Sequence, residues 1–530
     1  MNDRLKTPFK NEALRDFSLE KNRNFVAPAI AAWREVLPMT VPVVVDGEKI
    51  TDLPSKKITS PGDHSLTMAN YHEANQKLCD IALKSCEDNK KNWAHKFTTL
   101  QRAEILMKIA DIMREKSNEL CALLMLEVGK TVPEADGDVA EAIDFCEFYA
   151  REALRLEPST KLGDYPGEDN RYSYRPRGTA LVIAPWNFPL AILCGMAVAP
   201  LVCGNPVILK PAEQANVVAY EFYKIAIEAG VPAEVLHFLP GQGEDIGAYM
   251  LAHPQVHVIS FTGSKAVGLE ILNKANQLHA DQKHIKRVIV EMGGKNVLIV
   301  DDDADLDEAV DCALKSAFGF QGQKCSALSR IIVLENHYET FKKRFVDGLA
   351  SMKVGSVEEL SSKVAAVIDQ DSVDRLEKAY QNNKAKVAFR YKLSEELRSK
   401  GHYVPPTIFE ESEHKGDLAF NEFFGPYVTL FRAKDLDQAI EWANSTDYAL
   451  TGGIFSRSPK NIQRIKNELE VGNMYINRTI TGALVNRQPF GGYKLSGAGG
   501  KAGGPDYMLN FLEPITISEN TMRRGFAPEL

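Results

Sequence analysis

The sequence predicts an α/β protein with a doubly wound parallel sheet and a second α/β domain. From about residue 178, short β-rich segments alternate with helical ones, as where TALVIAP precedes LAILCGMAVAPLVCG. This alternation is the βαβ pattern of a parallel sheet. The chain has 530 residues, too many for one ordinary core, so two or three domains are expected.

The segments before and after this region complete the expected order of elements. VPVVVDGEKI is strand-like, and residues 70–155 have the apolar spacing of helices, as at Ile105, Ile109 and Ile112. After residue 301, DADLDEAVDCALKSAFGF is expected to form a helix with an acidic start, and the alternation then continues. Residues 470–505 are rich in Gly, Asn, Arg and Pro, which predicts a long ordered loop rather than packed elements.

Composition excludes several classes of function. The net charge is −8 and no strong basic block occurs, so no nucleic-acid partner is expected. No run approaches the roughly 18 apolar residues of a membrane span, and the N-terminus lacks signal or transit character. The eight cysteines form no CxxC pair, so no metal site is expected and the thiols are interpreted as reduced. A cytoplasmic protein without membrane association is predicted.

The segment FGFQGQKCSALSR places Cys325 in a polar, glycine-rich turn. A nucleophilic cysteine needs such an open position, where its thiolate can form and reach a substrate. Lys324 could favour the thiolate, although its side chain could equally point away. A buried structural cysteine is the alternative.

Two further segments follow predicted strands. In IVEMGGKN, Glu291 precedes two glycines, which suits a general base on a turn, although a solvated turn acid has the same pattern. In ISFTGSKAVG, a strand enters a turn at Gly263 and Ser264 before a helix. Amides at a helix N-terminus bind pyrophosphate, but a plain connection looks the same and no full GxGxxG is present.

Two more motifs lie at predicted carboxyl ends of strands, where ligands gather in open sheets. In APWNFPL, the Asn187 amide is placed to donate to a developing oxyanion. In ILKPAE, Lys210 and Glu213 are placed to bind ribose hydroxyls, and a carboxylate there would repel a 2′-phosphate. A turn asparagine and surface charges are the alternatives.

In this order, PWNFP, LKPAE, FTGS, EMGGKN, GQKCS and EFFGP resemble the aldehyde dehydrogenase superfamily, from about residue 40 to the end. The resemblance implies a Rossmann-type NAD-binding domain, an α/β catalytic domain and a small β oligomerisation extension. It implies that Cys325 is the nucleophile and that Asn187, with the Cys325 amide, forms the oxyanion hole. Glu291 would activate water against the thioester.

The same resemblance implies NAD, rather than NADP, as the cofactor. Lys210 and Glu213 would bind the ribose, and Glu422 and Phe424 would position the nicotinamide ribose and ring. The implied cofactor-binding residues are Ile183, Pro185, Trp186, Lys210, Glu213, Gly263, Ser264, Glu422 and Phe424.

A narrower resemblance links NMYINRTITGALVNRQPFGGYKLSGAGGKAGGPDY and GFQGQKCSALSR to the 1-pyrroline-5-carboxylate dehydrogenases. It implies oxidation of glutamate-5-semialdehyde to glutamate, the last step of proline breakdown. The implied substrate-binding residues are Glu141, Phe188, Ser326, Gly482, Ala483 and Phe490. Backbone amides and a hydroxyl would bind the substrate carboxylate, and two phenylalanines would wall its aliphatic part. Glu141 is a candidate ammonium partner, with a helix-surface acid as the alternative.

The expected domains are 1–155 (N-terminal segment and helices of the NAD-binding domain), 156–178 (oligomerisation hairpin), 179–300 (NAD-binding α/β domain), 301–495 (catalytic α/β domain) and 496–530 (tail joining the extension). The resemblance implies a homodimer or a multiple of dimers. At 364–369 the chain reads VAAVID instead of the family's usual Gly-Pro, in a region expected to lie away from the chemistry.

Other functions remain open from the sequence alone. They are oxidation of another polar semialdehyde such as succinic semialdehyde, acyl transfer to coenzyme A, and a non-catalytic structural or binding role. The ITGALV loop argues against the first, Glu291 against the second, and the presence of Cys325, Glu291 and Asn187 against the third.

Overall fold

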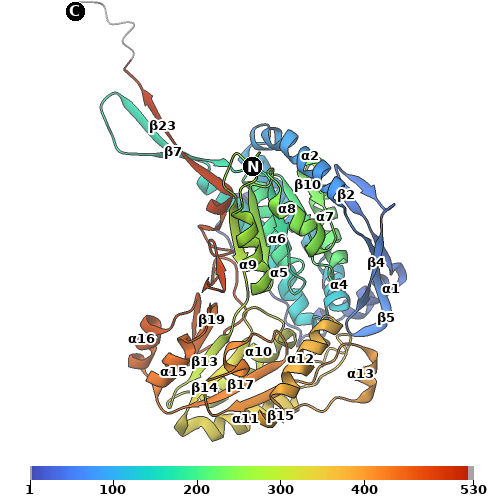
Figure 1. Ribbon diagram of the computed structural model, residues 1–530, viewed down its shortest axis with the longest axis vertical. Coiled ribbons are helices and arrows are strands. Elements are labelled where there is room, and N and C mark those ends of the chain that lie inside the picture. Colours follow the sequence, from blue (N-terminus) through green and yellow to red (C-terminus); the bar gives the residue numbers. More distant parts are fainter. Residues whose placement is uncertain (1–2, 523–530) are drawn as a thin grey trace, which may run out of the picture.

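The computed structural model describes residues 3–522 and places two α/β units one above the other, with a narrow β arm projecting from the upper unit (Figure 1). The predicted α/β fold class is confirmed. Within residues 3–522, no helix combines the length and the apolar character that crossing a bilayer requires.

The N-terminal part supplies a helical layer and a small sheet. Strands β1, β5 and β4 form that sheet, in the order β1-β5-β4. The elements are α1 (Val26–Val36), β1 (Met39–Val41), β2 (Val43–Val45), β3 (Glu48–Ile50), β4 (Ser55–Ser60), β5 (Asp63–His72), α2 (Gln76–His95), α3 (Thr99–Glu115), α4 (Ser117–Val128) and α5 (Val132–Leu156).

The upper unit contains an eight-stranded sheet in the order β22-β12-β11-β8-β9-β10-β2-β3. Its five central strands are parallel, and the chain reverses its direction of travel across the sheet between β10 and β11. The carboxyl ends of β8 and β11 therefore flank a topological switch point, where open sheets bind ligands. The elements are β8 (Ala180–Ile183), α6 (Ala191–Val202), β9 (Val207–Lys210), α7 (Asn216–Ala229), β10 (Leu236–Phe238), α8 (Ala248–Ala252), β11 (Val258–Thr262), α9 (Lys265–Ala275) and β12 (Arg287–Glu291).

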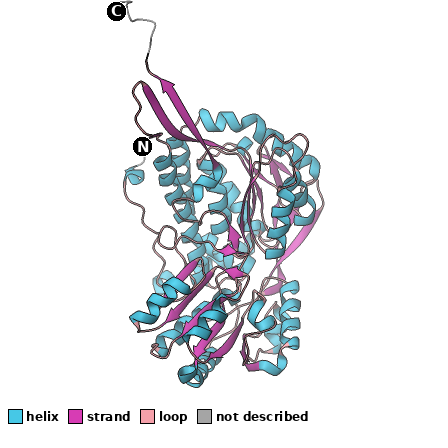
Figure 2. Ribbon diagram, turned by 60° about the vertical axis from the view of Figure 1, so that its left-hand side comes forward, coloured by secondary structure: helices cyan, strands magenta, loops and turns pink. Residues whose placement is uncertain are grey.

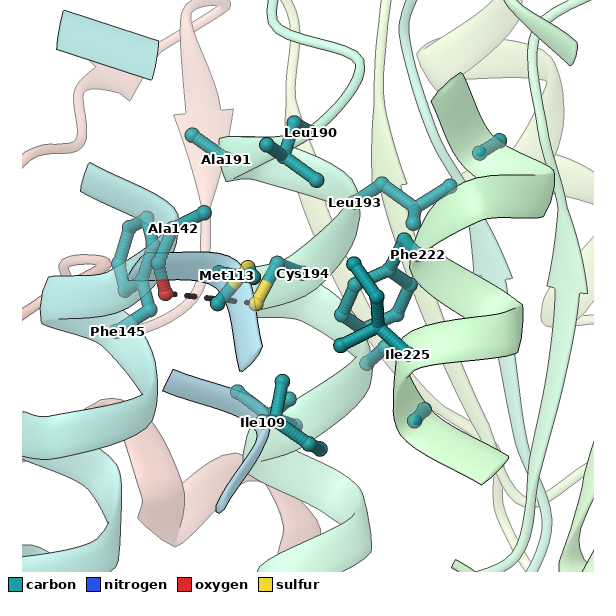
Figure 3. Close-up of a cluster of buried hydrophobic side chains, with 14 of the residues drawn as sticks. Ile109, Met113, Ala142, Phe145, Leu190, Ala191, Leu193, Cys194, Phe222 and Ile225 are labelled. Carbon is teal, nitrogen blue, oxygen red and sulfur yellow. Dashed lines mark hydrogen bonds between the residues drawn. The ribbon is translucent and has the colours of Figure 1, made fainter. Parts of the chain in front are cut away.

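Helices α3, α5, α6 and α7 pack together beside this sheet, and their apolar side chains interdigitate around Cys194 (Figure 3). The Cys194 thiol lies 3.5 Å from the Ala142 carbonyl oxygen and 3.5 Å from the Cys146 sulfur. All eight cysteines are free, and Cys146 and Cys194 are small, fully buried core residues. This rigid layer supports α5, which carries part of the candidate site.

The lower unit contains a seven-stranded sheet in the order β15-β16-β17-β14-β13-β19-β20, parallel except for β15. Two apolar cores lie on its faces. The elements are β13 (Asn296–Val300), α10 (Leu306–Phe318), β14 (Leu328–Leu334), α11 (Tyr338–Ser351), α12 (Gln370–Asn382), β15 (Val387–Arg390), α13 (Glu395–Lys400), β16 (Thr407–Glu411), α14 (Asp417–Phe420), β17 (Tyr427–Ala433), α15 (Leu436–Asn444), β18 (Tyr448–Ala449), β19 (Thr451–Phe455) and α16 (Pro459–Glu468).

The prediction that residues 470–505 hold no packed elements is wrong in part. Strands β20 (Asn473–Ile476), β21 (Tyr493–Lys494) and β22 (Gly497–Ala498) lie within this range. Strand β20 ends the lower sheet, and β22 pairs with β12 in the upper one. The glycines in this range have low strand propensity, so the sequence pattern indicated a loop. They are needed where two backbones approach closely; a Cβ at Gly497, for example, would lie 2.7 Å from the Val290 carbonyl oxygen.

The projecting arm is a three-stranded antiparallel sheet in the order β23-β7-β6. Its strands are β6 (Thr160–Lys161), β7 (Glu168–Pro176) and β23 (Leu512–Asn520). Both views show β7 and β23 extending away from the body (Figures 1 and 2). The hairpin and the C-terminal strand expected from the sequence are present, whereas the expected domain boundaries stay a prediction.

Candidate active site

Cys325 lies in a strained turn between α10 and β14. The short helical turn Gly319–Gly322 contains two non-glycine residues in the left-handed region, Phe320 at φ 49° and Gln321 at φ 57°. Gly322 has φ +67°, and a Cβ there would clash with the Gly425 carbonyl oxygen. Such conformations persist only where the surroundings enforce them, and they occur often at functional sites.

Asn296, the first residue of β13, holds this turn. Its side-chain amide donates to the Cys325 carbonyl at 2.7 Å and to the Ala327 carbonyl at 2.8 Å. Its side-chain oxygen accepts from the Thr451 amide at 3.0 Å. Within EMGGKN, only Glu291 was predicted to be functional, and Asn296 was not. An asparagine at the start of a buried strand is the signal in the sequence that points to it.

Asn187 reaches the same turn from the loop after β8. Its side chain is buried, and its Nδ2 donates to the Gln323 carbonyl oxygen at 3.1 Å. An amide nitrogen carries two hydrogens, so this bond leaves one donor beside the turn. The structure therefore brings Asn187 and the Cys325 segment together.

The segment 364–369 was expected to lie away from the chemistry, and this expectation is wrong. The Gln321 side-chain amide donates to the Ala366 carbonyl at 2.8 Å, and the Ile368 amide donates to Gln323 Oε1 at 2.9 Å. The segment thus supports the nucleophile turn directly. These bonds join residues 45 positions apart, so no local pattern reveals them.

Glu291 ends β12 with a carboxylate that is only partly satisfied. Its Oε2 is buried and has no hydrogen-bond partner among residues 3–522. Burial raises the pKa of Glu291 to about 8, while Lys501 and the Gly492 amide act in the opposite direction. A pKa near neutrality suits a group that must both accept and release a proton.

The environment of the Cys325 thiol disfavours its thiolate form. Burial, followed by the carboxylates of Glu291 and Glu422, raises its pKa well above the ordinary value, although the Ser326 amide opposes the shift. Lys324 does not supply a compensating charge, because its Nζ pairs with Glu134 at 2.6 Å. Among the charged side chains, Glu291 therefore has the largest effect on the thiol, and it is a candidate proton acceptor.

Glu422 and Phe424 occupy the side of the turn nearest the upper unit. Glu422 Oε1 accepts from the Gly294 amide at 2.9 Å. A Cβ at Gly293 would lie 2.6 Å from both carboxylate oxygens, so this approach requires glycine. Phe424, at φ 51°, packs edge-on against Trp186 with ring centroids 5.6 Å apart.

The carboxyl edge of the upper sheet carries the remaining predicted cofactor residues. Lys210 ends β9 and pairs with Glu213 Oε1 at 2.5 Å, and that oxygen also accepts from the Gly243 amide at 3.0 Å. Exposed Ser264 caps α9, accepting from the Val267 amide at 3.4 Å. Half-buried Ile183 and Pro185 lie at and beyond the end of β8, and the Gly263 amide donates to the Glu291 carbonyl at 3.0 Å.

These residues fit a dinucleotide. The edge presents a Lys–Glu pair, a helix N-terminus and an apolar surface beside a switch point, which are the features that bind ribose, pyrophosphate and base. No hydrogen bond among residues 3–522 joins this edge directly to the turn 319–327, except through Asn187. The loop after β8, which carries Asn187, therefore connects the cofactor edge to the nucleophile turn.

Glu141 lies on an acidic face of α5. Glu134, Asp138 and Glu141 share that face by their spacing, and Glu141 is half-buried rather than exposed. Burial and the Asp138 carboxylate raise the pKa of Glu141 to about 8, with Lys130 opposing. Within residues 3–522, no hydrogen bond reaches its carboxylate, and its partial burial does not fit the surface-acid alternative.

Lys130 is a buried cation that the sequence analysis missed. Its Nζ lies 3.3 Å from Asp138 Oδ2, 3.7 Å from the Phe188 ring centroid and 4.4 Å from that of Phe320. It therefore fixes Phe188, a predicted substrate wall, against the nucleophile turn. Nothing in the local sequence distinguishes this lysine from an exposed one.

The other predicted substrate residues lie on two segments. Gly482 has φ +75°, and for residues 3–522 neither its amide nor that of Ala483 has an acceptor. Ser326 is buried next to the nucleophile, and its hydroxyl makes no hydrogen bond to the described residues.

Phe490 is half-buried and paired with Ala502 through two backbone bonds of 2.9 and 2.8 Å. The 480–483 loop is tied to α10 by the Ile480 amide, which donates to Ser316 Oγ at 3.2 Å.

This arrangement has the parts of a covalent dehydrogenase: a thiol, a side-chain amide donor, a carboxylate base and a dinucleotide-type edge. The aldehyde dehydrogenase family model matches residues 51–517. The chain belongs to the aldehyde dehydrogenase family, as the sequence motifs indicated.

Relatives within the family are similar over almost the whole chain. A protein from Geobacillus sp. (strain WCH70) named 1-pyrroline-5-carboxylate dehydrogenase is 42% identical over 514 residues, covering 97% of this chain and 99% of that protein. The crystal structure of 1-pyrroline-5-carboxylate dehydrogenase from Thermus with bound NAD superimposes with a TM-score of 0.94 at 40% identity, covering 97% of this chain and 99% of that one.

A longer protein contains a similar unit. Proline utilization A from Bdellovibrio bacteriovorus superimposes with a TM-score of 0.96 at 46% identity. The match covers 99% of this chain but 54% of that protein. This chain therefore spans about half the length of that relative.

Proposed function

We propose that this protein oxidises L-glutamate-5-semialdehyde to L-glutamate with NAD, through a thioester on Cys325. The open aldehyde is in equilibrium with its cyclic imine, 1-pyrroline-5-carboxylate, and the reaction is the final step of proline degradation. The observation that carries the proposal is the turn at Cys325. Asn187 donates an amide hydrogen to this turn, and the Glu291 carboxylate, one oxygen of which has no partner within residues 3–522, acts on the pKa of the thiol.

The first step is addition of the thiol to the aldehyde. The Cys325 sulfur bonds to the aldehyde carbon, the thiol proton passes to a water molecule, and the carbonyl electron pair moves to oxygen. The free Asn187 N–H and the Cys325 amide donate to that oxyanion. One donor of this kind accounts for roughly 10²–10³ in rate.

Oxidation and hydrolysis complete the reaction. NAD, when bound, supplies the acceptor for the hydride that leaves the hemithioacetal carbon. Glu291, once it has lost its proton, deprotonates a water molecule that attacks the resulting thioester carbon. The carbon–sulfur bond then breaks, glutamate leaves and Cys325 regains a proton.

The cofactor residues support NAD in particular. Glu213 lies where a ribose 2′-hydroxyl would be bound, and its carboxylate would repel the 2′-phosphate of NADP. Lys210 keeps that carboxylate oriented. Ser264 and the first turn of α9 would face the pyrophosphate, and Glu422 with Phe424 would position the nicotinamide ribose and ring, next to Trp186.

The substrate residues support an amino-acid aldehyde. The open Gly482 and Ala483 amides and the Ser326 hydroxyl would bind the α-carboxylate. Glu141, unpaired and half-buried, would bind the α-ammonium, which would restore its ionised form. Phe188 and Phe490 would wall the aliphatic part.

The proposal extends to the location and the assembly of the enzyme. We place it in the cytoplasm, and we expect a homodimer or a multiple of dimers formed through the projecting arm. A free β edge on an arm that extends from the body is a surface suited to pairing with a second copy.

An aldehyde panel assayed with NAD tests the substrate assignment. Glutamate-5-semialdehyde should exceed succinic semialdehyde in kcat/KM by roughly 10² or more, because charge-assisted hydrogen bonds of about 1.5–3 kcal/mol each are lost. The Glu141→Gln variant should raise KM for glutamate-5-semialdehyde without changing that for an aliphatic aldehyde. Equal or better use of succinic semialdehyde by the unaltered enzyme would contradict the assignment.

A further inference from the structure

Lys501 holds an ammonium group in one fixed position in the loop between β22 and the 3-10 helix Tyr507–Phe511. Its Nζ donates to the Gly491 carbonyl at 2.6 Å, the Gly472 carbonyl at 2.7 Å and Asn473 Oδ1 at 3.0 Å. A lysine has three donors, so these bonds satisfy it completely. The cation is therefore anchored rather than free in solvent.

Gly491 separates this lysine from the base Glu291. A Cβ at Gly491 would lie 3.0 Å from Glu291 Oε1 and 3.5 Å from both Cα and Cγ of Lys501. The next residue, Gly492, gives its amide to Glu291. The carboxylate and the lysine thus both lie against one glycine, and the lysine binds the carbonyl of the backbone on which the carboxylate rests.

The same loop carries a predicted substrate wall. Phe490 and Ala502, the neighbours of Gly491 and Lys501, form a two-bond antiparallel bridge. Lys501 also lines an open hollow of about 420 Å³ together with Asn473, Tyr475 and Gln488.

We propose that Lys501 is the positioning residue for thioester hydrolysis: it fixes the 490–492 loop beside Glu291 and supplies a positive charge that favours the ionised form of the base. The proposal rests on the proposed function, in which Glu291 is that base. Lys501 does not touch the reacting atoms and acts only through Glu291 and its loop.

Three titratable side chains influence Glu291 or are influenced by it: Lys501, the Cys325 thiol and the Tyr507 hydroxyl. Neither neutral group would stabilise the carboxylate by charge, which leaves Lys501 for that role. Hydrolysis needs the carboxylate, so its rate should rise with pH through about 8, the pKa to which burial raises Glu291 despite the opposing effect of Lys501. Loss of the ammonium should move this rise to higher pH.

The test is rapid-quench kinetics on the full-length enzyme with NAD and glutamate-5-semialdehyde, across pH 6 to about 10. NADH formation reports thioester formation, and decay of acid-trapped thioester reports hydrolysis. In Lys501→Met, NADH formation should change little. Thioester decay should slow about tenfold at neutral pH, and its rise with pH should move up by about one unit. Lys501→Arg, which keeps the charge, should retain the original pH profile.

Lys286→Met is the matched control. Lys286 is also buried and bonded to a carbonyl, that of Leu251 at 2.7 Å, but it precedes β12 at the end opposite Glu291. It should leave the decay profile unchanged. If Lys501→Met decays like this control, or if it slows both steps with no change of pH profile, the inference is overturned. The Glu291→Gln variant distinguishes failure of the Lys501 inference from failure of the proposed function. Normal thioester decay in that variant would overturn the role of Glu291 as the base.

Discussion

The nucleophile and the base of this enzyme are held in opposite ways. The Cys325 carbonyl is bound by Asn296, and the Gln323 carbonyl and side chain are bound by Asn187 and Ile368. Glu291, by contrast, keeps one buried oxygen without a partner. The turn is braced from three separate segments, whereas the carboxylate rests on glycines.

This difference matches what each group must do. A nucleophile acts best when its position relative to the carbonyl carbon is fixed beforehand. A base that takes a proton from an incoming water molecule must keep an oxygen available for it. A carboxylate with all its lone pairs engaged would lose that ability and would have a low pKa.

Among variants that test this difference between the nucleophile and the base, Glu291→Gln should have the largest effect. The amide cannot accept a proton, so thioester hydrolysis should fall by about 10²–10⁴. Fold and cofactor binding should be retained, because the side chain has the same shape. Quench kinetics should show trapped thioester persisting, and the exposed substitution Glu395→Gln serves as the control. Unchanged steady-state turnover would break the assignment of the base.

Asn187→Ala tests the donor side of the turn. Loss of one oxyanion donor should lower the rate of thioester formation by about 10²–10³ with little effect on KM for NAD. The measurement is the NADH transient at saturating cofactor. A variant that lost only thermal stability would show that Asn187 is a brace and not a donor.

Asn296→Ala tests the bracing itself. Two buried carbonyls would lose their donor, which should destabilise the protein by about 1–3 kcal/mol and lower kcat about tenfold. Asn205→Ala is a close match, since Asn205 donates to the Pro200 and Phe511 carbonyls at 3.2 and 3.1 Å away from the site. Thermal unfolding should report similar losses for both variants, and kcat should fall only for Asn296→Ala. Equal kcat values would mean that the turn does not need this brace.

The smallest effect is expected at the cofactor edge. Glu213→Gln removes the charge that would repel a 2′-phosphate but keeps hydrogen-bonding atoms. The ratio of kcat/KM for NAD to that for NADP should fall several-fold, by up to about tenfold. Kinetics with both cofactors measure it. A ratio unchanged within error would mean that the ribose 2′-hydroxyl of the cofactor is not bound by Glu213.

The sequence predicted best those features that depend on neighbours in the chain. One sheet edge carries Asn187, Lys210 and Ser264, each at or just beyond the end of a strand. They lie together because parallel strands have their carboxyl ends at the same edge. The projecting arm was also predicted, from resemblance rather than from propensity.

The features that the sequence did not predict depend on distant contacts. Asn296 reaches Cys325 across 29 positions, and Gln321 reaches Ala366 across 45. Lys130 is buried only because α5, Phe188 and Phe320 enclose it. The strands β20 and β22 were hidden by glycines that a propensity pattern assigns to loops.

The measurement that tests the account most directly is peptide mapping by mass spectrometry of acid-quenched enzyme during turnover of glutamate-5-semialdehyde with NAD. In the Glu291→Gln variant, a glutamyl group should accumulate on Cys325 alone among the eight cysteines, and Cys325→Ala should form neither the adduct nor NADH. A glutamyl group on another residue, or NADH formation by Cys325→Ala at an undiminished rate, would contradict the account.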